Sequence, residues 1–108
     1  MLAPVAELLV EIHAPLTPSD VPAGEYSFPW IDSVMEFLFE LDGSKGEMYD
    51  DGEEVGGEYL FFVHGASEAE LIALAREVAA LPGMPSGVYA TVTDTEADMG
   101  GGTRVDLD

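Results

Sequence analysis

Two histidines and a nearby carboxylate are the residues of this sequence best suited to hold a metal or move a proton. His13 ends the run VAELLVEIH, with Glu11 two residues before it, and His64 ends the run EYLFFVH. If the two runs are neighbouring parallel strands, both imidazoles lie at the same end of a sheet. Two imidazoles and a carboxylate can bind a transition metal or act as an acid–base pair. The alternative is two half-exposed histidines at strand ends in a very acidic domain.

A second set of candidates is the acidic run EMYDDGEEVGGEYLFF at residues 47 to 62. Its central carboxylates are Asp50, Asp51, Glu53 and Glu54. Carboxylate oxygens bind calcium and magnesium, but an EF-hand loop needs glycine at its sixth position and glutamate at its twelfth. In DDGEEVGGEYLF, glycine is third and phenylalanine is twelfth. Three interpretations stay open: a plain hairpin loop that turns at residues 51–52 or 56–57, weak cation binding, and recognition of a basic partner.

The charge of the chain limits its partners. There are 22 acidic residues against 3 basic ones, for a formal net charge of -19, yet 47% of the residues are hydrophobic. That apolar content is too high for a disordered acidic tail, so a folded domain carries the charge. Such a surface repels nucleic acid and anionic membranes, and attracts basic proteins, polyamines and divalent cations.

The sequence lacks the residues that several classes of chemistry require. The chain has no cysteine, which excludes thiol nucleophiles, disulfides and thiolate metal sites. It contains no GxSxG, P-loop, Rossmann or HExxH motif, and its three basic residues are too few to clamp phosphorylated or carboxylated substrates. Glu7 and Glu11 interrupt the N-terminal apolar run, unlike a signal peptide. We therefore expect a cytoplasmic protein without a cofactor, and favour a function other than catalysis.

Hydrophobic periodicity predicts the elements that position these residues. Alternation predicts strands at 5–13, 46–50, 58–64 and 87–93, while helical stripes predict helices over 30–41 and 67–81. The second helix has a capping box, with Ser67 at the cap and Glu70 three residues later. Residues 95–108 form a polar, glycine-rich tail that is compatible with an added edge strand through TRVDL.

This order of elements indicates an α+β fold in a single domain over residues 1–108. Strand, helix, strand, strand, helix, strand is the βαββαβ pattern of a ferredoxin-like two-layer sandwich. We expect a four-stranded antiparallel sheet with both helices on one face.

Three short runs resemble a known family. PWID, DDGEEVG and YLFFVHGA, within residues 25 to 94, are similar to a family of small acidic bacterial proteins that are uncharacterised. The resemblance implies no function and carries no site residues across.

The face of the sheet opposite the helices is expected to carry apolar side chains. Leu60 and Phe62 alternate with the residues that face the helices, and Leu9 and Tyr89 are expected beside them. An exposed apolar patch often marks an interface, which predicts a homodimer through this face. Alternatively, the proline-rich connection after the first strand and the C-terminal tail fold over it and complete a second small core.

We favour a non-enzymatic interaction module that binds a basic protein, in the manner of an immunity protein, antitoxin or inhibitor. The expected partner-binding residues are Asp50, Asp51, Glu53 and Glu54 of the acidic run and Asp32, Glu36 and Glu40 on the outer face of the first helix. The alternative is a dimeric small-ligand or metal-binding domain that uses His13, His64 and Glu11 on the open sheet face. A third interpretation ascribes the charge to adaptation to high salt.

Overall fold

A computed structural model describes residues 8–16, 28–41, 46–94 and 102–107 of the chain. Two helices and five strands follow one another in the order β1, α1, β2, β3, α2, β4, β5. The helices are α1 (Pro29–Phe39) and α2 (Glu68–Ala79), and the strands are β1 (Leu8–Pro15), β2 (Glu47–Val55), β3 (Glu58–His64), β4 (Tyr89–Asp94) and β5 (Thr103–Asp106).

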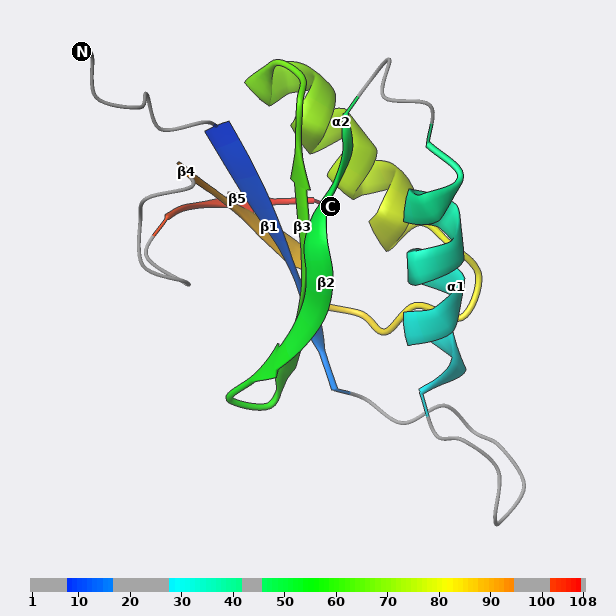
Figure 1. Cartoon of the computed structure of the whole chain (residues 1–108). Coiled ribbons are helices and arrows are strands. Elements are labelled where there is room, and N and C mark those ends of the chain that lie inside the picture. Colours follow the sequence, from blue (N-terminus) through cyan, green and yellow to red (C-terminus); the bar gives the residue numbers. More distant parts are fainter. Residues whose placement is uncertain (1–7, 17–27, 42–45, 95–101, 108) are drawn as a thin grey trace, which may run out of the picture.

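The strands form one antiparallel sheet in the order β2-β3-β1-β4-β5, and both helices lie on the same side of it (Figure 1). The α+β class, the two helices and the antiparallel sheet are as predicted. The predicted number of four strands is too small, because β5 pairs with β4 at the edge. The sequence also favours a short strand at residues 25–28, which lies outside the described residues except for Phe28.

The helices form where the sequence indicates them. In α2, the Ser67 hydroxyl accepts a hydrogen bond from the Glu70 backbone N–H, and the Glu70 carboxylate accepts one from the Ser67 backbone N–H. This is the predicted capping box, which satisfies two backbone donors that a helix start otherwise leaves without partners. In α1, Pro29 occupies the first turn, where a missing N–H costs nothing. Each helix buries one apolar stripe, which in α1 comprises Trp30, Ile31, Val34 and Leu38.

The expectation that the strands bearing the two histidines run parallel is wrong. β1 and β3 are antiparallel, with Val10 opposite Val63 and His13 opposite Leu60. The reason is topological: the crossover through α1 returns the chain so that β2 runs parallel to β1, and the tight β2–β3 hairpin then reverses it. The carboxyl ends of β1 and β3 therefore lie at opposite ends of the sheet.

The acidic run is a strand and not a loop. β2 extends through residues 50–54, and only Gly56 and Gly57 form the turn to β3, with φ values of 56° and 85°. Two consecutive residues at positive φ are typical of the type I′ hairpin turn, which suits glycine. The other expected turn, at residues 51–52, lies within the strand, where the Tyr59 ring packs directly on Gly52. The register shifts twice between Met48 and Glu53, so the middle of β2 is irregular.

The two sides of the sheet are buried in different ways. The main core lies between the sheet and the helices, where Val10 and Ile12 of β1 and Phe61 of β3 pack against the apolar stripes of α1 and α2. On the other side, Leu9, Leu60 and Phe62 form a small second cluster and are each at least 90% buried within the single chain. These three side chains therefore offer little apolar surface for the expected homodimer. Within the proline-rich connection of residues 14–29, residues 17–27 lie outside the described part of the chain.

Candidate functional site

A polar network centred on His13 lies on the sheet face opposite the helices. The His13 ring is 3.0 Å from Thr91 Oγ1 through Nε2 and 3.2 Å from Glu58 Oε1 through Nδ1. The Thr91 hydroxyl donates to Glu11 Oε1 at 2.8 Å, and the Tyr89 hydroxyl donates to Glu58 Oε1 at 3.1 Å. Glu11, His13 and Thr91 are 1%, 4% and 5% exposed. The network thus joins β1, β3 and β4 with buried groups that each have a hydrogen-bond partner.

The Thr91 hydroxyl and the His13 ring connect the two carboxylates of this network. Thr91 has one hydroxyl proton, which it donates to Glu11, so its oxygen accepts the proton of His13 Nε2. On its other side, the His13 ring meets Glu58 Oε1 through Nδ1 at 3.2 Å. The chain of contacts runs from a fully buried carboxylate, Glu11, to Glu58, whose side chain is 31% exposed. The array thus links a buried carboxylate to a partly exposed one across the His13 ring.

Aromatic stacking extends the network to β5. The Tyr89 ring stacks on His13 with 4.5 Å between centroids and 9° between planes, and the Arg104 guanidinium lies 4.0 Å above the Tyr89 centroid. Arg104 Nε also donates to Asp106 Oδ1 at 3.0 Å. Burial, and then the hydrogen bond to Glu58, raise the pKa of Tyr89 above its ordinary value. The stacking of Tyr89 on His13 and the cation–π contact of Arg104 attach the short edge strand β5 to the network.

His64 lies apart from this network. Its Nε2 is 3.5 Å from Glu47 Oε1, and its ring meets the Tyr49 ring edge-on with 4.9 Å between centroids. Since His13 is opposite Leu60, His64 is four residues farther along β3, or about 13 Å away. The structure thus brings Glu11 and His13 together but not His64. Among the described residues, no three or more metal-ligating side chains are grouped so as to hold an ion.

Of this network, Glu11 and His13 were predicted as site residues and Tyr89 was expected on the same sheet face, whereas Glu58 and Thr91 were not predicted. Glu58 and Thr91 lie 45 and 78 positions from His13 in the chain, and only the strand register brings them together. One signal was available: Glu11 and His13 in β1, and likewise Tyr89 and Thr91 in β4, are polar residues two positions apart. Residues two apart in a strand share a face, so each pair predicts a polar row across one face of the sheet.

The carboxylates expected to bind a partner lie on α1 and β2. Asp32 and Glu36 of α1 and its C-cap residue Glu40 are exposed. They follow one another at intervals of four and so share one stripe of the helix surface. On β2, Glu53 and Glu54 are exposed, opposite Leu60 and Tyr59 of β3. Asp50 lies in β2 opposite Phe62, and Asp51 follows it; their side chains lie outside the described part.

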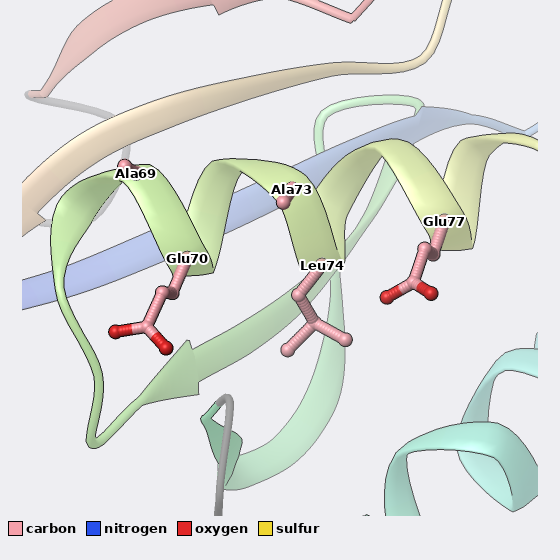
Figure 2. A pocket seen from close by; sticks show the side chains of 5 residues that line it. All are labelled: Ala69, Glu70, Ala73, Leu74 and Glu77. Carbon is pink, nitrogen blue, oxygen red and sulfur yellow. The ribbon is translucent and has the colours of Figure 1, made fainter.

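A shallow groove of about 460 Å³ runs along α2. Glu70, Leu74 and Glu77 point to the same side of the helix, with Leu74 between the two carboxylates (Figure 2). Ala69 and Ala73 complete its lining.

None of the described helices is long and apolar enough to cross a membrane. Comparison with known proteins found no matching family, no matching curated protein and no matching solved structure.

Proposed function

We propose that this chain is a small acidic interaction module that binds a basic protein, built on a ferredoxin-like βαββαβ arrangement with β5 added at one edge. The observation that carries this proposal is the one-signed charge of α1 and β2. Every charged residue in these two elements is acidic, and the carboxylates of Asp32, Glu36, Glu53 and Glu54 are exposed. The proposed contact residues are Asp32, Glu36 and Glu40 of α1 and Asp50, Asp51, Glu53 and Glu54 of β2.

Physical chemistry supports this use of the charge. Successive carboxylates of this stripe are four residues apart, or about 6 Å along the helix, which is shorter than the roughly 8 Å over which physiological salt screens a charge. Their fields therefore overlap along the stripe. Complementary charge of this kind raises association rates and rejects partners of the same sign. Immunity proteins, antitoxins and inhibitors of basic enzymes are the functional class that such a surface fits.

The test begins with capture of binding proteins at low ionic strength on the immobilised chain, followed by purification of any basic protein recovered. Its association rate is then measured as a function of salt. We expect the rate to fall steeply as salt rises. A rate independent of salt, or the recovery of no basic protein, would refute the proposal.

Matched double variants locate the contact. Glu36→Lys with Glu40→Lys changes the net charge by the same amount as Glu68→Lys with Glu77→Lys, and all four residues are exposed. We expect the α1 pair to slow association by about tenfold and the α2 pair by much less, because a surface charge acts mainly on charges within a Debye length. If the α2 pair has the larger effect, the groove on α2 is the contact and the assignment to α1 is wrong.

A further inference from the structure

Among the described strands, β2 has a neighbour on one side only, so its other side is an edge at which another chain can pair. β2 is the first strand in the sheet order, and no described strand lies beyond it. In Figure 1 it stands at the front edge of the sheet, with no described element in front of it. β2 has nine residues, against four in β5 at the opposite edge. A long edge strand presents backbone N–H and C=O groups that an extended peptide can bind.

The hairpin turn indicates which backbone groups face outward. In a two-residue type I′ hairpin, the residues flanking the turn form a hydrogen-bonded pair, which here is Val55 and Glu58. Hydrogen-bonded and non-bonded pairs alternate along an antiparallel ladder. The N–H and C=O of Glu54 therefore point away from β3, toward the open edge. This part of β2 is regular, since the register shifts lie before Glu53.

The side chains of β2 indicate what can pair there. Three large apolar side chains of the described residues are substantially exposed, and two of them, Tyr49 at 43% and Val55 at 41%, are in β2. Glu53 and Glu54 are exposed beside Val55. Two copies of such an edge repel each other, since like charges on paired strands are unfavourable. Lysine and arginine on an incoming strand would instead meet opposite charge.

We propose that β2 receives an extended segment of the partner as an additional strand, with lysine or arginine alternating with β-branched residues. This inference rests on the proposed function and specifies the form of the basic partner. Backbone hydrogen bonds hold the segment, the carboxylates select its charge, and Tyr49 and Val55 contact its apolar side chains. The like charge on β2 keeps the same edge from pairing with itself.

The probe is a synthetic peptide of alternating lysine and valine, labelled for fluorescence anisotropy. Two modified peptides carry N-methyl groups on alternate residues, one on the odd and the other on the even positions. A paired strand uses the N–H groups of one set only. We expect the unmodified peptide to bind, one methylated peptide to bind at least about tenfold more weakly, and the other to bind nearly as well. Equal binding of all three would refute strand pairing.

A pair of variants makes the same test on the protein. Glu54→Pro removes the outward N–H while the bonds to β3 remain, and proline is tolerated at such edge positions. Glu54→Gln removes only the charge. We expect the proline variant to weaken binding of the unmodified peptide by about tenfold relative to the glutamine variant. Circular dichroism checks that both fold.

The outcomes separate the two proposals. If a basic protein binds with salt dependence but N-methylation and Glu54→Pro have no effect, the interaction module stands and strand addition at β2 is wrong. If the unmodified peptide does not bind at low salt, strand addition is likewise refuted, whatever the capture experiment recovers.

Discussion

Replacing Thr91 by valine tests whether the buried network stabilises the sheet. Valine has nearly the shape of threonine but lacks its hydroxyl group. In the wild type this hydroxyl donates to Glu11 at 2.8 Å and accepts from His13 at 3.0 Å. The variant therefore removes one donor from a carboxylate and one acceptor from an imidazole while leaving the packing volume almost unchanged.

The expected cost follows from the burial of the groups left behind. Glu11 and His13 are 1% and 4% exposed, so water does not readily replace the lost hydroxyl. Leaving a buried polar group without a partner costs about 1–3 kcal/mol, and more for a charged group. Glu11 has further interactions, which limit the loss on its side. We expect the free energy of unfolding to fall by about 3 kcal/mol, a large part of the roughly 5–15 kcal/mol typical of a domain.

Urea unfolding of the wild type, Thr91→Val and Thr93→Val provides the measurement. Thr93 lies two residues along the same strand and on the same face, but is partly exposed and has no hydrogen bond with the network. Its replacement should change stability by less than about 0.5 kcal/mol. If Thr91→Val and Thr93→Val lower the free energy of unfolding by the same amount, and this free energy depends equally on urea concentration in both, the hydrogen bonds assigned to Thr91 do not stabilise the fold.

Three further variants test other parts of the structure. Burial, and then Glu58, raise the pKa of Tyr89, so the contribution of this group to stability is present below pH 10 and is lost as pH rises through the folded-state pKa. In urea unfolding at high pH, the Tyr89→Phe variant should therefore lose less stability with rising pH than the wild type. Identical pH profiles of the two proteins would contradict this. Gly52→Ala places a Cβ against the Tyr59 ring and should cost about 1–3 kcal/mol in thermal unfolding, a penalty that should largely vanish in a Tyr59→Ala background. Ser67→Ala removes the cap of α2 and should cost about 1 kcal/mol in urea unfolding, and an unchanged midpoint would show that the capping box is dispensable.

Local signals in the sequence were sufficient for the helices. In α2, the cap, the acidic first turn and the apolar stripe all belong to one stretch of chain, and the structure has each of them. The acidic run shows where local signals fail. Aspartate, glutamate and glycine disfavour strands, so residues 50–54 suggested a loop. Pairing with the buried strand β3 outweighs that preference, and the chain turns only where two glycines adopt positive φ.

The network could not be predicted because it depends on strand register. Alternation in β1 places Glu11 and His13 on the same face, but it does not show that this face is buried or that Glu58 and Thr91 lie opposite. The error about His64 has a different origin. The order of elements already required β1 and β3 to be antiparallel, so topology alone separates the two histidines.

The carboxylates of this chain fall into two groups with different electrostatic surroundings. Glu11 and Glu58, in the sheet, accept hydrogen bonds from Thr91, Tyr89 and His13, which offset their burial. The exposed carboxylates of α1 form no ion pair with any described residue, and self-repulsion among such charges works against the compact state. A fold selected for stability alone would gain from neutralising some of them. The exposed carboxylates of α1 and β2 suit the proposed binding of a basic protein, because such a partner would offset this repulsion on binding.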